Sequence, residues 1–234
     1  MACAMNILRH PRSSPMQSPC ALAKTGWLAE QPTDFQERLT ALGNWRTYRT
    51  GQSLYEVGDE PNALFGLESG LLDIAIPISE DEIATLHRAG PGTWGGDSAL
   101  LAGSPRVVSL TAHVDSLVFV VPASALMRHL AERPEDLFNF YKLNHRNFEL
   151  ALKALAEVVA LPPRTRFARL LLRLAASDEV IRATQTELGK LAGMSRAAFR
   201  RAFCELLAAG VVKTEYGKVL ITDRAALEAE AERR

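Results

Sequence analysis

One stretch, from Thr184 to Val212, limits the possible folds more than any other part of the 234-residue chain. Thr184 precedes Glu187 by three residues, a spacing typical of a capping box at the start of a helix. A short helix is therefore expected over Thr186–Leu191. It is followed by Gly193, whose lack of a side chain lets a tight connection adopt a positive φ at little steric cost.

A second helix is predicted directly after this connection. Ser195 is a good N-cap residue, and Gly210 is suited to the position after the last helical turn. Helical spacing places the apolar residues of this segment on one face: Phe199, Ala202, Phe203, Leu206 and Leu207. The opposite face contains mostly small and basic residues: Arg196, Ala197, Arg200, Arg201 and Cys204.

Two interpretations of this helical hairpin compete. It could be an ordinary hairpin with a solvated basic face, or a helix-turn-helix that binds DNA. The three arginines lie in the first two turns of the second helix, which enter the major groove in helix-turn-helix proteins. Two short strands around a turn follow, as in a winged helix. The sequence therefore predicts binding to double-stranded DNA through Thr184, Ser195, Arg196, Ala197, Arg200, Arg201 and Lys218.

Charge is distributed unevenly, although the formal net charge is zero. From Pro163 onward, 14 Lys and Arg residues outweigh 9 Asp and Glu residues by 5, and the preceding part has 13 against 18, a balance of −5. A basic C-terminal third is suited to attracting phosphate. The cysteines have neither a metal-binding spacing nor a disulfide framework, and the N-terminus has no long apolar run. We expect a cytoplasmic protein with no membrane segment and no metal site.

The first half of the chain has the sequence pattern of a β-domain. Residues 1–24 lack periodicity and are expected to form a flexible tail, and residues 32–42 fit a short helix. Nine of the fifteen glycines fall between Gly51 and Gly103, where they separate short runs rich in Val, Ile and Leu. Such punctuation is typical of an all-β sandwich or barrel. A sensor domain of this type is predicted over residues 25–133.

A long helix is predicted over residues 134–161, between Pro134 and the Pro162-Pro163 pair. Six of its residues recur at intervals of three and four: Tyr141, His145, Phe148, Leu152, Leu155 and Val159. This apolar stripe fits a helix that pairs with a second copy of itself, although packing against its own domain would give the same pattern. The DNA-binding unit is predicted over residues 162–234. It is expected to begin with another helix, over Arg164–Ala176, and a connection over Asp178–Arg182 that leads to the hairpin.

This combination resembles the Crp/Fnr family of bacterial transcription regulators. The most specific stretches are Leu54-Tyr55-Glu56-Val57-Gly58-Asp59 through Phe65-Gly66-Leu67-Glu68-Ser69-Gly70, and Thr184 to Gly210. The resemblance implies an α+β protein with an N-terminal β-roll (double-stranded, jelly-roll-like) similar to a cyclic-nucleotide-binding domain, a long dimerisation helix and a C-terminal winged helix-turn-helix. It also implies a cytoplasmic homodimer, an inverted-repeat operator and contact with RNA polymerase.

The phosphate cassette departs from the pattern of the family's cyclic AMP binders. Binders have G-E-L followed by Arg-Ser or Arg-Thr, and a Thr-Ser pair on the dimerisation helix. Here the aligned candidates for an effector pocket are Gly96, Asp97, Ser98, Arg106, Val107, Ala151 and Leu152. Of the polar partners of the nucleotide, only the arginine is kept unchanged, and each lost hydrogen bond costs about 1–3 kcal/mol. Tight binding of cyclic AMP is not expected, which leaves a different ligand or, as we favour, a roll that no longer senses one.

Other functions and sensors have less support. Cys3 and Cys20 alone are too few for an iron–sulfur cluster. Haem remains an alternative through a histidine, although no spacing marks a ligand among His87, His113, His129 and His145. Cys204 is expected to be a passive small residue, with a redox role as the alternative. A cyclic-nucleotide-gated effector or enzyme subunit is disfavoured by the basic helix. An enzyme is disfavoured because no nucleophile–base pair, metal spacing or phosphate loop is evident.

The same resemblance bears on base recognition. In many family members, the second helix has a Glu four residues before an Arg, and these residues contact a C and a G of the half-site. The corresponding residues here are Ala197 and Arg201. A methyl group cannot accept a hydrogen bond from a cytosine amine, whereas an arginine can bind a guanine through two hydrogen bonds. We therefore expect a half-site that differs from the family's usual T-G-A core.

Overall fold

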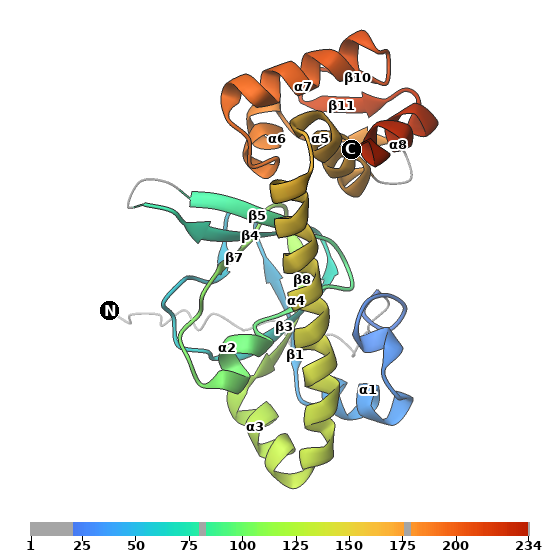
Figure 1. Ribbon diagram of the computed structural model, residues 1–234. Coiled ribbons are helices and arrows are strands. Elements are labelled where there is room, and N and C mark those ends of the chain that lie inside the picture. The colour runs from blue at the N-terminus through green and yellow to red at the C-terminus, as the bar shows by residue number, and fades with distance from the viewer. Residues whose placement is uncertain (1–20, 80–82, 176–178, 234) are drawn as a thin grey trace, which may run out of the picture.

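The chain folds into a β-roll, a long helix and a winged helix-turn-helix unit (Figure 1). This architecture is seen in a computed structural model that describes residues 21–79, 83–175 and 179–233. The α+β class and the order of the three parts agree with the sequence prediction. Within the described ranges, no helix is long and apolar enough to cross a membrane.

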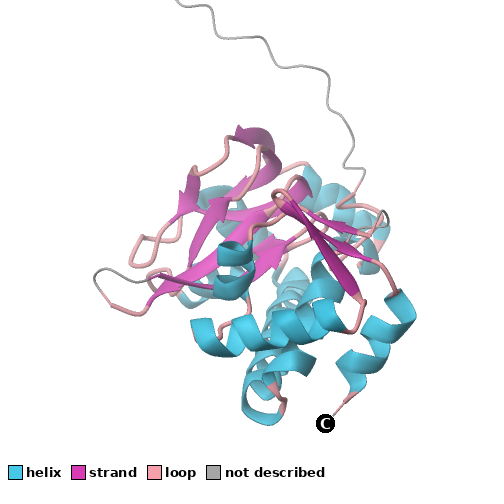
Figure 2. Cartoon of the chain, turned by 90° about the horizontal axis from the view of Figure 1, so that it is seen from above, coloured by secondary structure: helices cyan, strands magenta, loops and turns pink. Residues whose placement is uncertain are grey.

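Two four-stranded antiparallel sheets form the β-roll (Figure 2). One sheet has the order β1-β8-β3-β6, and the other has the order β2-β7-β4-β5. Val118 to Val121 of β8 are all buried, so this strand is covered on both faces. The strands of the first sheet are β1 (Asn44–Tyr48), β3 (Ala63–Ser69), β6 (Trp94–Gly95) and β8 (Ser116–Pro122). Those of the second are β2 (Ser53–Tyr55), β4 (Leu72–Pro77), β5 (Ile83–Ala89) and β7 (Ser109–Ala112).

The segment before the roll is packed against it. The backbone N–H groups of Ala21 and Leu22 donate to the Glu68 carboxylate at 2.8 and 3.1 Å, and the Leu22 side chain is fully buried. The predicted flexible tail is therefore wrong for residues 21–24, because an apolar anchor and a carboxylate acceptor hold them; residues 1–20 lie outside the described part. Two short helices follow, η1 (Leu28–Glu30) and α1 (Thr33–Thr40).

The long helix begins with a 3-10 turn, η2 (Pro134–Asp136), and continues as α4 (Leu137–Ala160). Its 24 residues span about 36 Å. Phe140 and Leu143 near its start are buried in one core with Trp27, so this core crosses the predicted domain boundary after residue 133. In Figure 1, α4 runs alongside the roll, and its last turns reach the C-terminal unit. Two further helices, α2 (Asp97–Ala102) and α3 (Ala123–Glu132), complete the N-terminal part.

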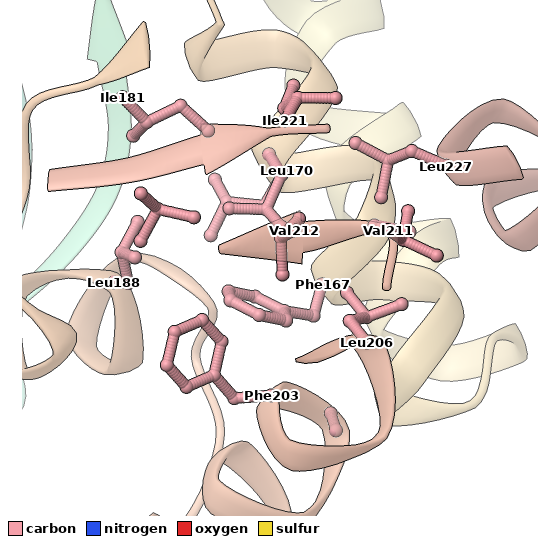
Figure 3. Close-up of a cluster of buried hydrophobic side chains, with 14 of the residues drawn as sticks. Phe167, Leu170, Ile181, Leu188, Phe203, Leu206, Val211, Val212, Ile221 and Leu227 are labelled. Carbon is pink, nitrogen blue, oxygen red and sulfur yellow. The ribbon is translucent and has the colours of Figure 1, made fainter. Parts of the chain in front are cut away.

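The C-terminal unit has its own apolar core, built around the ring of Phe167 (Figure 3). Phe167 contacts Phe199 and Phe203 edge-on, at centroid distances of 5.1 and 5.6 Å. This core fixes the position of the second helix of the predicted hairpin. The helices of the unit are α5 (Pro163–Leu174), α6 (Gln185–Leu191), α7 (Arg196–Ala208) and α8 (Arg224–Glu232), and its sheet consists of β9 (Val180–Ile181), β10 (Val212–Glu215) and β11 (Lys218–Ile221).

Two elements of this unit differ from the sequence prediction. The predicted connection Asp178–Arg182 contains β9, which pairs with β11 and extends the wing to three strands. Helix α8 was not predicted from the sequence. It is capped by Asp223, whose carboxylate accepts the Ala226 N–H at 2.9 Å, and it packs against α5.

Candidate nucleic-acid interface and ligand pocket

The predicted capping box at the start of α6 is confirmed. The Thr184 hydroxyl accepts the backbone N–H of Glu187 at 3.2 Å, and the Glu187 carboxylate accepts the Thr184 backbone N–H at 2.7 Å. The hydroxyl also donates to this carboxylate, at 2.8 Å. The Thr184 side chain is therefore held in place, and the residue is exposed at the N-terminus of the first helix of the motif. Gly193 then adopts the expected positive φ of 56°.

Helix α7 presents the predicted basic face to solvent. Ser195 caps the helix by accepting the Ala198 N–H at 3.3 Å, while Phe199 and Phe203 are buried against the core. In the described part of the chain, the three arginines of this face form no ion pair. The basic side chains and their small neighbours are all exposed: Arg196, Ala197, Arg200, Arg201 and Cys204. The structure thus brings the sequence-predicted residues of α7 onto one free surface.

The wing adds a second group of polar residues. Lys218 is half-buried and forms an ion pair with Glu215 at 2.8 Å, so it is less free than the arginines of α7. Tyr216 is fully exposed at the tip of the hairpin, where Gly217 has a φ of 69°. Sequence analysis had not singled out Tyr216. Its position follows from the two-residue loop between β10 and β11.

Arg106, the retained polar residue of the phosphate cassette, is buried in the protein. Its guanidinium donates to the carbonyl oxygens of Gly96 at 2.7 Å and Ala63 at 2.6 Å, and it lies 4.3 Å from the centroid of the Tyr55 ring. The side chain is only 2% exposed. Burial lowers the pKa of Arg106 and raises the pKa of Tyr55 to about 12. This candidate pocket residue therefore connects β3 to the loop before α2.

Asp97 connects α2 to the long helix. Its carboxylate accepts hydrogen bonds from the side-chain amides of Asn147 at 3.1 Å and Asn144 at 3.4 Å, both on α4. Burial raises the pKa of Asp97, and the amide donors oppose that shift. Asn144 and Asn147 were not predicted as site residues. Their three-residue spacing places two amides on the buried side of an amphipathic helix, a signal that sequence analysis could have used.

The remaining pocket candidates lie apart from this network. Val107 is 65% exposed, and Leu152 is 47% exposed on α4. Ala151 is exposed one turn beyond Asn147, and Ser98 is also exposed, on α2. The predicted effector residues are thus divided between a buried network and solvent-exposed positions.

The histidines considered as haem ligands are also separated. His113 bonds Asp73 at 3.1 Å, and His129 bonds Asp136 at 2.7 Å. His87 lies on β5, and burial lowers its pKa. His145 is exposed on α4. Among the described residues, no group of three or more His, Cys, Asp or Glu side chains could hold a metal ion.

The apolar stripe of α4 is largely exposed and is not covered by the described part of the chain. Phe148 is 57% exposed, Leu155 is 58% exposed and Val159 is 78% exposed. Tyr141 is exposed as well, and its ring is stacked with that of His145 at 6.4 Å. The alternative of packing against the helix's own domain is disfavoured, because the buried residues Phe140 and Leu143 lie outside the stripe.

Family comparisons agree with both halves of this architecture. Residues 45–133 match the family model of the cyclic nucleotide-binding domain, and residues 165–230 match that of the Crp-like helix-turn-helix domain. The chain belongs to the Crp/Fnr family of transcription regulators. The helix-turn-helix of this Crp/Fnr-family regulator is therefore a DNA-binding motif.

Two relatives and one solved structure illustrate the similarity. The transcriptional regulatory protein btr of Bordetella pertussis is 24% identical over 216 residues, which cover 88% of this regulator and 89% of that protein. The cyclic AMP receptor protein of Thermus thermophilus is 29% identical over 188 residues, which cover 78% of this regulator and 86% of that protein. A Crp/Fnr-family transcriptional regulator from Thermus thermophilus has the same fold, with a TM-score of 0.69 at 22% identity over 82% of this chain and 100% of that one.

Proposed function

We propose that this chain is a homodimeric, sequence-specific DNA-binding regulator whose β-roll does not respond to cyclic AMP. The observation that supports it most directly is the exposed basic face of α7, positioned by a buried aromatic core. The site of action is the cytoplasm, where the DNA lies, and RNA polymerase is the partner suggested by the family. We assign no catalytic activity and no cofactor.

Base recognition is assigned to the first turns of α7. Arg201 binds a guanine in the major groove, and Arg196 and Arg200 contact the flanking phosphates. Ala197 leaves the cytosine amine without an acceptor, and its methyl group is suited to a thymine methyl. Thr184 and Ser195 cap the starts of α6 and α7, where the backbone N–H groups of the first helical turn favour phosphate. The half-site therefore departs from the family's T-G-A core.

Dimerisation is assigned to the exposed stripe on α4. Its residues follow a heptad spacing, and their side chains are exposed among the described residues. Pairing two such helices would remove this apolar surface from water. A twofold dimer presents two α7 helices to half-sites about 34 Å apart, so an inverted-repeat operator is expected.

Loss of cyclic AMP binding is supported by the state of Arg106 and Asp97. The guanidinium of Arg106 is bound to two backbone carbonyls, and the carboxylate of Asp97 is bound to two amides of α4. A cyclic nucleotide would have to reach a guanidinium that is only 2% exposed, and Val107 next to it provides no polar group. A ligand shifts a conformational equilibrium only through a difference in affinity for the two states. Without binding, the nucleotide cannot change operator affinity.

One experiment tests this proposal. An unbiased selection from random DNA supplies the operator, and its affinity is then measured with and without millimolar cyclic AMP or cyclic GMP. Equal affinities are expected, with no heat of nucleotide binding by calorimetry. Micromolar binding of either nucleotide with a parallel rise in operator affinity would instead make the chain a nucleotide-responsive regulator, as the name of the Thermus relative suggests for that protein.

A further inference from the structure

The β-roll and the DNA-binding unit meet at a group of charged side chains. Helix α6 packs against β5 (Figure 1). At this contact, Arg88 of β5 donates twice to the carboxylate of Asp73 of β4, at 2.7 and 3.1 Å. His113, directly after β7, lies between Asp73 and Glu187 of α6. We call these four residues, Asp73, Arg88, His113 and Glu187, the interdomain cluster.

The two ring nitrogens of His113 face two different carboxylates. Nδ1 lies 3.1 Å from an oxygen of Asp73, and Nε2 lies 3.9 Å from an oxygen of Glu187. Because an ionised Asp73 can only accept, Nδ1 must be the nitrogen that keeps its proton in the neutral ring. Nε2 then presents a lone pair to the Glu187 carboxylate, which is repulsive. Protonation turns Nε2 into a donor and makes the same contact attractive.

The charged groups that face His113 come from all three neighbouring elements. Asp73 belongs to β4 and Glu187 to α6. Arg88 of β5 is linked to His113 through its ion pair with Asp73. The side chain of Arg88 is only 6% exposed, and those of His113 and Asp73 are 20% and 21% exposed. This shielding strengthens electrostatic contacts relative to those in bulk water. The hydrogen bond with the Thr184 backbone and, to a lesser extent, the charges of His113 and Arg88 lower the pKa of Glu187, so that its carboxylate stays ionised.

The docked arrangement leaves the DNA-contacting face free. Arg196, Arg200 and Arg201 remain exposed while α6 contacts the roll. Docking therefore fixes the orientation of the helix-turn-helix without covering α7. In a dimer that must place two helices on two half-sites, a fixed orientation reduces the entropy lost on binding.

We propose that His113 is a positioning residue: its protonated ring bridges Asp73 and Glu187, docks the helix-turn-helix on the β-roll, and so increases affinity for the operator. This inference rests on the proposed function for its DNA readout, but docking itself can be measured without DNA. Imidazole side chains change charge between about pH 5 and about pH 8, so operator affinity rises as the pH falls through this range. His113 thereby gives the roll an influence on DNA binding that requires no small ligand.

The first test follows the ring of His113 in the DNA-free protein. Its protonation is titrated by NMR in the wild type, in Glu187→Gln, and in Glu228→Gln as a matched control. Glutamine keeps the capping geometry at position 187 but removes the charge. Glu228 is an exposed partner of Arg224 within the C-terminal unit. Glu187→Gln should lower the titration midpoint of His113, since it removes a negative charge 3.9 Å from Nε2 that favours the protonated ring. Glu228→Gln should leave it unchanged.

The second test measures operator affinity from about pH 8 to about pH 6 for the wild type, His113→Gln and Glu187→Gln. Between about pH 8 and about pH 6, the operator affinity of the wild type should rise about fivefold more than that of either variant, because each dimer contains two interdomain clusters of modest strength. An identical midpoint in the wild type and Glu187→Gln would overturn the bridge. A shifted midpoint with identical affinity profiles would overturn the positioning role. Absence of DNA binding at every pH would refute the proposed function, whereas the NMR result would still report docking.

Discussion

Leu152→Asp tests the assignment of the α4 stripe to a dimer interface. Fully burying one large apolar side chain stabilises by about 1.5–3 kcal/mol, and the stripe residues are roughly half exposed, so each should contribute about 1 kcal/mol on pairing. Tyr141, Phe148, Leu152, Leu155 and Val159 from both protomers then supply roughly 10 kcal/mol. Association costs about 4–15 kcal/mol in lost freedom. The gain from burial and the cost of association are therefore similar in size, so a substitution at a single position can prevent dimerisation.

Substitution by aspartate removes the apolar contribution of two leucines and places two carboxylates near the twofold axis. Each unpaired charge that is buried costs several kcal/mol. The combined loss of at least about 4 kcal/mol raises the dissociation constant of the dimer roughly a thousandfold or more. Sedimentation velocity at micromolar concentration should therefore show a monomer, and operator affinity should fall with it.

Met127→Asp is a matched control, because Met127 is 48% exposed on α3, against 47% for Leu152, but lies outside the stripe. It should sediment as the wild type does. If Leu152→Asp also retained the wild-type dimer, the interface would have to lie elsewhere, and the heptad spacing of α4 would have to be explained by another partner.

Two further predictions concern DNA recognition and stability. Arg201→Ala should weaken operator binding by about 1–3 kcal/mol and relax base preference at one position, as measured by fluorescence anisotropy and a binding selection; unchanged specificity would place the guanine contact on another residue. Asp136→Asn should lower the free energy of unfolding by about 2–3 kcal/mol, a value that already allows for the partial exposure of Arg38. The reason is that the Asp136 carboxylate accepts hydrogen bonds from Arg38 at 2.9 and 3.1 Å and bonds His129 at 2.7 Å. Burial opposes ionisation of Asp136, but its hydrogen bonds with Arg38 and His129 outweigh it and lower the pKa. The stabilisation is therefore present above the unfolded pKa of about 3.9 and is lost as the pH falls through the lower folded value, so urea unfolding of the two proteins should differ fully near about pH 7 and converge in acid.

Local signals explain which parts of the fold could be predicted. The hairpin of α6 and α7 is specified by the caps Thr184 and Ser195 and by Gly193, all of which act on neighbouring backbone groups. β9 has only two residues and forms through pairing with β11, so no periodic pattern marks it. The burial of Leu22 depends on Glu68, which is distant in the sequence. α8 had a usable signal in its N-cap Asp223, but its alanine-rich sequence has little apolar periodicity.

The state of the pocket candidates could not be predicted in the same way. Spacing showed that Arg106 is retained, but its partners are the backbone carbonyls of Gly96 and Ala63, which no side-chain pattern reveals. The interdomain cluster was also missed. It forms only when the β-roll and α6 are brought together, and Glu187 had already been explained as part of a capping box.

The polar groups of the roll point to how it acts within the proposed function. Asp97 bonds Asn144 and Asn147, which fixes α4 against α2, and His113 faces Glu187, which fixes α6 against the roll. Both contacts hold an element on which the placement of α7 depends, and neither needs a bound nucleotide. A roll with these internal bonds can keep its DNA-binding unit oriented without an effector, since the orientation that ligand contacts would otherwise select is already stabilised by its own side chains.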